Sequence, residues 1–152
     1  MWTVTFDDDE QKEDYDFQEL FRYRASRPVV KFEDCRGRTL NALELFCGEG
    51  IVTQAFSMRE FNVRSIDLEP DSYAMMVLDI LEAKYEDIGF VPDFIWASPP
   101  CKWYSAAHKQ EEIDTSKADT IVLKILSISR PAQPRCAMLE NPATSLLATK
   151  PF

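Results

Sequence analysis

From residue 39 onward the chain alternates short apolar runs with stretches of helical periodicity, and each apolar run ends in a polar or Gly/Pro turn. Strands that alternate with helices are typical of a parallel sheet. The expected strands are 40–46, 62–66, 93–97 and 136–139. The pattern therefore predicts an α/β fold with a doubly wound parallel sheet, in which ligands bind beyond the carboxyl ends of the strands.

Three helices are expected between these strands. The first covers 51–59, and the second starts at the Asp71-Ser72 cap and runs toward Leu78. The third helix is ended by Pro131, and its buried face is expected to consist of residues at helical spacing: Ala118, Ile121, Val122, Ile125 and Ser129. At 152 residues the chain has room for one domain with a hydrophobic core.

The first 38 residues differ from the rest and are predicted to be an acidic extension ahead of a domain at 39–152. Eight acidic residues lie between Asp7 and Glu19, and six basic residues follow between Arg22 and Arg38. We expect the acidic half to be mobile or surface-bound, with one short helix over 16–24.

Charge and cysteine usage limit the classes of partner. A net charge of −9 argues against nucleic-acid binding on charge alone, although the basic residues of the extension allow a local basic face. The four cysteines and the single histidine, His108, match no zinc site or disulfide framework, so no metal is expected. Cys47 and Cys136 lie in apolar runs, where buried packing is expected.

The chain carries no signal for export or for a membrane. No apolar run approaches the roughly 18 residues of a transmembrane helix. The start of the sequence lacks the basic and apolar regions of a signal peptide. We therefore expect a soluble, intracellular protein of the cytoplasm or nucleus that does not bind membranes.

The turn after the first expected strand contains Gly48 and Gly50, two of the four glycines in the chain. Glycine permits a positive φ and lets a ligand approach the backbone closely. A dinucleotide fingerprint needs a third glycine where this chain has Thr53. A pyrophosphate site is therefore disfavoured, and the turn is compatible with a nucleoside cofactor without phosphates; a turn that binds no ligand is the alternative.

An acidic residue followed by an apolar residue comes directly after the second expected strand and again after the second expected helix. Asp67, before Leu68, is placed to accept the ribose hydroxyls of a nucleoside, while the apolar side chain covers the base. Asp79 and Ile80 repeat the arrangement and are placed to face an adenine amino group. Surface acids at the ends of elements are the alternative for both pairs.

Two further turns carry groups that suit covalent catalysis. Pro99 and Pro100 fix the backbone after an apolar strand and hold Cys101 at the sheet edge, where a thiolate can act as a nucleophile. A cysteine protease would need His108 as its base, and the turn does not resemble a protease site. Glu140, after the last strand, is placed to have a raised pKa and act as an acid. A cysteine in a Pro-rich loop and an ordinary strand terminator are the alternatives.

Taken in order, these blocks resemble the DNA cytosine-C5 methyltransferase family. The family's glycine-containing first motif is similar to residues 45–50, and its Pro-Pro-Cys motif matches Pro99-Pro100-Cys101. Its Glu-Asn-Val motif corresponds to Glu140-Asn141-Pro142. These last two motifs are most similar to those of short methyltransferase-like proteins of phages and large viruses. The resemblance covers 40–152 and implies a Rossmann-like, class I S-adenosylmethionine-dependent methyltransferase fold.

The resemblance also implies roles for individual residues. S-adenosylmethionine would be bound by Phe46, Gly48, Gly50, Asp67, Leu68, Asp79, Ile80 and Pro99. Cys101 would add to C6 of a cytosine flipped out of DNA, and Glu140 would hydrogen-bond or protonate N3. Asn141 would be the third catalytic residue beside Cys101 and Glu140, and its role would be to position the loops. Two alternatives stay open: a non-catalytic module that binds S-adenosylmethionine or a partner chain, and a methyltransferase acting on RNA or free nucleotides.

The chain departs from the family at three places. Pro142 replaces a valine, Tyr104-Ser105 stands where Phe-Ser is usual, and the sequence ends at Phe152 before the family's later strands and target-recognition region. We therefore expect a sheet that is incomplete at its C-terminal side, with the last strand as an edge. The alternatives are a fragment, cover from a protein partner or a second copy, and cover from the N-terminal extension.

Overall fold

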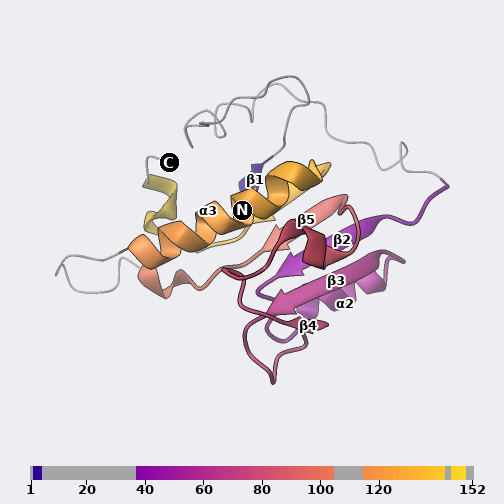
Figure 1. Cartoon of the computed structure of the whole chain (residues 1–152), viewed down its shortest axis with the longest axis horizontal. Coiled ribbons are helices and arrows are strands. Elements are labelled where there is room, and N and C mark those ends of the chain that lie inside the picture. The colour runs from indigo at the N-terminus through magenta and orange to yellow at the C-terminus, as the bar shows by residue number, and fades with distance from the viewer. Residues whose placement is uncertain (1, 5–36, 105–114, 143–144, 150–152) are drawn as a thin grey trace.

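A computed structural model describes residues 2–4, 37–104, 115–142 and 145–149. It contains one six-stranded sheet with the order β1-β6-β5-β2-β3-β4 (Figure 1). The strands are β1 (Trp2–Val4), β2 (Asn41–Leu45), β3 (Asn62–Asp67), β4 (Met76–Val77), β5 (Phe94–Ala97) and β6 (Cys136–Leu139). All neighbouring pairs are parallel except β1 with β6, which is antiparallel. The predicted α/β fold and its four expected strands are confirmed.

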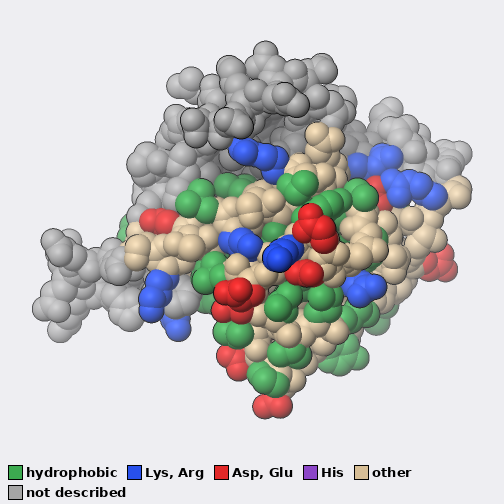
Figure 2. Space-filling view, viewed as in Figure 1, with side chains coloured by type: hydrophobic (Ala, Val, Ile, Leu, Met, Phe, Trp, Pro, Cys, Tyr) green, Lys and Arg blue, Asp and Glu red, His purple; other side chains and the backbone are tan. Residues whose placement is uncertain are grey.

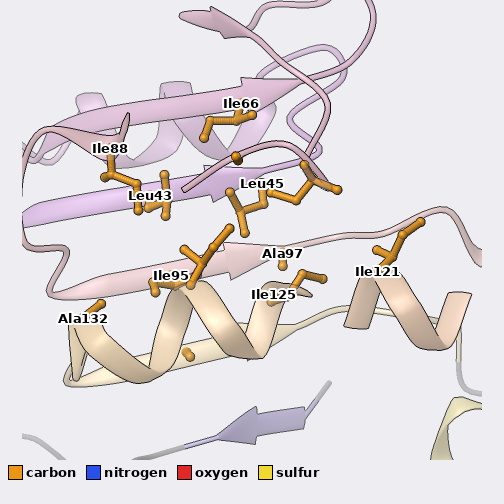
Figure 3. Close-up of a cluster of buried hydrophobic side chains, with 13 residues drawn as sticks. Leu43, Leu45, Ile66, Ile88, Ile95, Ala97, Ile121, Ile125 and Ala132 are labelled. Atoms are coloured by element: carbon orange, nitrogen blue, oxygen red, sulfur yellow. The ribbon is translucent and has the colours of Figure 1, made fainter. Parts of the chain in front are cut away.

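Two α-helices cover opposite faces of the sheet. In the described part of the chain these helices are α2 (Ile51–Ser57) and α3 (Ser116–Ala132). The described residues also form short 3-10 helices: η3 (Tyr85–Ile88), η4 (Cys101–Trp103) and η5 (Leu146–Thr149). Figure 3 shows α3 packed over Ile95 and Ala97 of β5. Neighbouring strand residues point to opposite faces, and Phe94 contacts Phe56 of α2, with ring centroids 6.3 Å apart. The sheet is therefore doubly wound.

The predicted apolar face of α3 is confirmed. All five residues expected on it are buried: Ala118, Ile121, Val122, Ile125 and Ser129. The helix includes Pro131 in its last turn and ends after Ala132, where Gln133 takes a left-handed conformation. Among the described helices, none is long and apolar enough to cross a membrane.

The prediction of a helix from Asp71-Ser72 to Leu78 is wrong. This stretch forms turns and bends that lead into β4. Its backbone amides bond to neighbouring elements instead of the preceding helical turn: Tyr73 N–H donates to Gly48 O at 2.7 Å, and Met75 N–H to Ser65 Oγ at 3.0 Å. Leu78 N–H donates to Asp67 O at 2.8 Å. These tertiary bonds outweigh the local helical pattern.

The amino ends of the central strands are joined through Asp93. Its carboxylate accepts a hydrogen bond from the Asn41 amide at 2.9 Å and pairs with the Arg38 guanidinium. Burial acts to raise the pKa of Asp93, but the bonds from Arg38 and Asn41 and the nearby positive charges of Arg38 and Arg135 lower it below its ordinary value. These bonds of Asp93 hold the start of β2 against the start of β5.

The edge of β6 is covered by the chain itself. Trp2, Thr3 and Val4 of β1 pair with Leu139, Met138 and Ala137. Cover from the N-terminal extension, one of the three expected alternatives, is therefore what the described residues show. The expected helix over 16–24 lies outside the described residues, as do the acidic cluster and most of the basic one.

Deleting residues 1–4 should expose the β6 edge. We expect the free energy of unfolding to fall by about 1–3 kcal/mol, because backbone hydrogen bonds to β6 are lost, and self-association to rise as unpaired edges meet. Denaturant unfolding and sedimentation velocity measure these effects. Thr3→Ala, which keeps the backbone pairing, is the control; a deletion variant that is monomeric and as stable as wild type would contradict the edge-covering role of β1.

Candidate cofactor and nucleophile site

The predicted site residues lie along one edge of the sheet. Gly48 follows β2, Asp67 ends β3 and Asp79 follows β4, while Cys101 and Glu140 follow β5 and β6. These five strands are parallel, so their carboxyl ends meet at the same edge. The strand order puts the two catalytic candidates on one side of the glycine turn and the two acids expected to bind the cofactor on the other.

The strand order reverses between β2 and β5. From β2 the chain moves outward through β3 and β4, then returns to the other side of β2 as β5. At this point Ser98 N–H donates to Leu45 O at 3.3 Å, and Ser98 Oγ donates to Phe46 O at 3.2 Å. Ligands of doubly wound sheets bind at such a reversal. The glycine turn and the Pro-Pro-Cys turn flank it.

The two glycines of the turn have different surroundings. Both have a positive φ, +50° at Gly48 and +71° at Gly50. A Cβ added at Gly48 would meet no heavy atom within 4 Å, whereas one at Gly50 would lie 2.6 Å from the Tyr73 ring. Of the two glycines, Gly48 is therefore the one with open space for a ligand beside it. Gly50 is closed by Tyr73, and Phe46, which also has a positive φ, begins the turn.

Thr53, where a third glycine would stand, has a structural contact. Its hydroxyl donates a hydrogen bond to the buried Glu44 carboxylate, which joins α2 to β2. Burial raises the pKa of Glu44, and this hydrogen bond opposes the rise. The absence of a glycine at this position is thus explained by packing beneath the turn.

Asp67 connects the glycine turn to the loop after β3. Its carboxylate accepts hydrogen bonds from Gly48 N–H at 2.8 Å and from Glu69 N–H at 2.9 Å, one on each oxygen. A carboxylate oxygen can accept a second bond, so this partly exposed group keeps capacity for two hydroxyl donors. Leu68, beside it, is 58% exposed.

Asp79 and Ile80 lie beyond β4 with different exposure. Asp79 is partly exposed, and its carboxylate accepts a hydrogen bond from Leu81 N–H at 2.9 Å. Ile80 is buried in the main core. The structure thus places Asp79 at the edge and Ile80 largely beneath it.

Hydrogen bonds join the turns that carry Cys101 and Glu140. Glu140 N–H donates to Ala97 O at 2.8 Å, and the Asn141 amide donates to Pro99 O at 3.4 Å. Asn141 is buried, and its Oδ1 has no hydrogen-bond partner among the described residues. Cys101 is exposed and begins η4, so its thiol is accessible at the edge.

The other described cysteines are less suited to act as nucleophiles. Cys47 is buried and Cys136 half-buried. Burial raises the pKa of both thiols, and the nearby Glu44 and Asp67 charges raise that of Cys47 further. A raised pKa lowers the thiolate fraction at neutral pH. Cys35 lies outside the described residues. Within the described residues, no group of three or more His, Cys, Asp or Glu side chains could hold a metal ion.

Tyr104 anchors the turn that carries Cys101, and the sequence motifs do not predict this role. The side chain is 1% exposed, and its hydroxyl donates to Asp119 of α3 at 2.7 Å. Its backbone bonds to Cys101 O and accepts from Leu146 N–H. The only signal in the sequence is a tyrosine where the family usually has phenylalanine. Tyr73, in the loop after β3, contacts the glycine turn, and the sequence did not predict this contact because the segment was expected to be helical.

Tyr104→Phe should cost about 1–2 kcal/mol of unfolding free energy, because Asp119 loses a buried donor. Burial, and then the Asp119 contact, raise the pKa of Tyr104 above the ordinary tyrosine value of about 10. The folded state thus favours the neutral phenol, so the stability advantage of wild type is full below about pH 10 and shrinks as the pH rises further. Denaturant unfolding from pH 8 to pH 11 measures this. Tyr85→Phe is the control, and a difference that does not change with pH would contradict the assignment.

Comparison with known proteins identifies the family of the chain. The family model for C-5 cytosine-specific DNA methylase matches residues 40–149. Among solved structures, the chain is similar to the sugar N-methyltransferase KedS8 from Streptoalloteichus sp ATCC 53650, at 14% identity and a TM-score of 0.41, over 84% of this chain and 52% of that one. The chain thus spans about half the length of that structure. No curated protein matches it. Because the family model covers most of its length, the chain belongs to the C-5 cytosine-specific DNA methylase family.

Proposed function

We propose that this protein transfers a methyl group from S-adenosylmethionine to C5 of cytosine in DNA, with Cys101 as the nucleophile. The observation that carries the proposal is the placement of Gly48 and Asp67 on one side of the strand-order reversal and of Cys101 on the other. A cofactor and a thiol that act on one base need such adjacency. Membership of the C-5 cytosine-specific DNA methylase family supports the same chemistry.

The residues at the edge fit an adenosyl cofactor better than a pyrophosphate. The surroundings of Gly48 are open, and Asp67 retains two acceptor positions for ribose hydroxyls. Carboxylates gather in this part of the chain, where a pyrophosphate would be repelled: Glu49, Asp67, Glu69, Asp71 and Asp79. S-adenosylmethionine carries a positive sulfonium and no phosphate, so these charges favour it.

The remaining predicted cofactor residues would complete this site. Phe46 and Gly50 would shape the turn, and exposed Leu68 would cover the adenine, with Asp79 and Ile80 framing it. Pro99, buried in the turn after β5, would close the side toward Cys101. When bound, S-adenosylmethionine supplies an electrophilic methyl group.

The chain's own groups would prepare the base. The Cys101 thiolate would form a bond to C6 of the cytosine, which moves electron density to C5. Glu140 would hydrogen-bond or protonate N3 and so stabilise the added charge. Once C5 carries the methyl group, a water molecule would take the C5 proton, the C5–C6 double bond would re-form, and the sulfur–C6 electron pair would leave with the thiolate. Any proton given to N3 would return to Glu140. Asn141 would hold the two turns together through its contact with Pro99.

Access to C6 requires the base to leave its stack, so the substrate would be a flipped cytosine. DNA is the proposed partner because the family described by the matching model acts on DNA. RNA or a free nucleotide would be open to the same cysteine chemistry. Methyl-transfer assays with matched DNA, RNA and cytidine nucleotide substrates decide between them.

A second candidate is a module that binds S-adenosylmethionine or a partner chain without turnover. The net charge of −9 favours it, because DNA binding usually rests on a basic surface. On the face shown in Figure 2, acidic and basic side chains are interspersed, and the described residues there form no continuous basic surface. Cofactor binding without transfer to any nucleic acid would support this candidate.

Cys101→Ser should abolish methyl transfer while leaving cofactor affinity nearly unchanged, because the thiol acts on the base and not on the cofactor. We expect a loss of at least about a thousand-fold in a tritium-methyl transfer assay, with calorimetry reporting the affinity for S-adenosylmethionine. Cys136→Ala is the matched control, since Cys136 lies at the amino end of β6, away from the edge. Transfer that survives in Cys101→Ser would exclude the covalent mechanism.

A further inference from the structure

Tyr73 is fixed against the glycine turn, yet most of its side chain is exposed. Its amide donates to Gly48 O at 2.7 Å. Its Cβ, Cγ and Cδ1 lie 2.7, 2.8 and 2.6 Å from the position of a Cβ added at Gly50. Even so, the residue is 61% exposed. One side of the tyrosine therefore contacts the turn, and a large part of its surface is available to a ligand.

The loop that carries Tyr73 is tied to the same turn through Asp67. One Asp67 oxygen binds Gly48 N–H, and the other binds Glu69 N–H at the start of the loop. Ser72 N–H then donates to Glu69 O at 3.0 Å, and Met75 N–H donates to Ser65 Oγ of β3. These bonds fix the loop on both sides of Tyr73, so the loop holds the Tyr73 ring in a defined position.

An exposed aromatic ring held in place beside a ligand turn is suited to binding. Leu68, which directly follows Asp67 at the start of this loop, is also exposed, at 58%. Apolar side chains that flank a carboxylate match the chemistry of a nucleoside, in which a flat base adjoins ribose hydroxyls. An aromatic face also attracts a nearby cation such as a sulfonium.

We propose that Tyr73 forms a wall of the cofactor site and covers the adenosyl group held by Gly48 and Asp67. This inference rests on the proposed function, because it takes S-adenosylmethionine as the ligand. The ring supplies the contact and the hydroxyl does not.

The inference is tested by calorimetry with S-adenosylmethionine on the full chain. Tyr73→Phe should bind within about two-fold of wild type, and Tyr73→Ala about ten-fold more weakly. Val91→Ala is the matched control, because Val91 is equally exposed, at 61%, but precedes β5 at the opposite edge of the sheet. Its affinity should be unchanged. Circular dichroism checks that each variant is folded.

Hydroxyl-radical footprinting of the wild-type chain gives a second measurement without any substitution. Oxidation of Tyr73 should fall when S-adenosylmethionine is added, and oxidation of Val91 should not. Cofactor binding that leaves Tyr73 oxidation unchanged, or a folded Tyr73→Ala with wild-type affinity, would overturn this inference alone. A wild-type chain that does not bind the cofactor at all would overturn the proposed function and, with it, the role of Tyr73.

Discussion

β2 and β5 are the middle pair of the six-stranded sheet, and their parallel pairing positions the candidate site. Asp93 fixes one end of this pair through Asn41 and Arg38, and Ser98 fixes the other through Leu45 and Phe46. Because the chain reaches β5 only after passing through β3 and β4, the pair is also where the strand order reverses. Groups that lie far apart in the sequence thereby meet at one edge.

Around this pair, two short-range anchors shape the edge. Tyr73 closes Gly50 and leaves Gly48 open, whereas Tyr104 ties the turn of Cys101 to Asp119 of α3. In both cases a side chain from outside the sequence motif contacts the turn that carries the motif. In the proposed mechanism the motif residues carry the chemistry, and these tyrosines pack beside them.

The strands and the long helix could be predicted from sequence because periodicity and turn residues agree there, as at β5 before Pro99. The segment around Asp71 could not, since its amides bond to Gly48, Ser65 and Asp67, which no local pattern reveals. The position of the site at the carboxyl ends of the strands could be predicted because it follows from the parallel direction of the strands alone. The roles of Tyr73 and Tyr104 depend on tertiary contacts and were missed. Cover of β6 by the N-terminal extension was one of three alternatives from the sequence, and the pairing of β1 with β6 selects it among the described residues.

Attack of Cys101 on a cytosine beside the bound cofactor can be trapped with DNA that contains 5-fluorocytosine, together with S-adenosylmethionine. A base can remove a proton from C5 but cannot remove fluorine as a cation, so the sulfur–C6 bond would persist after methylation. If Cys101 is the nucleophile, mass spectrometry finds the nucleotide attached to the peptide that contains Cys101. A chain that binds the cofactor but carries no adduct, or carries it on another cysteine, would exclude Cys101 as the nucleophile.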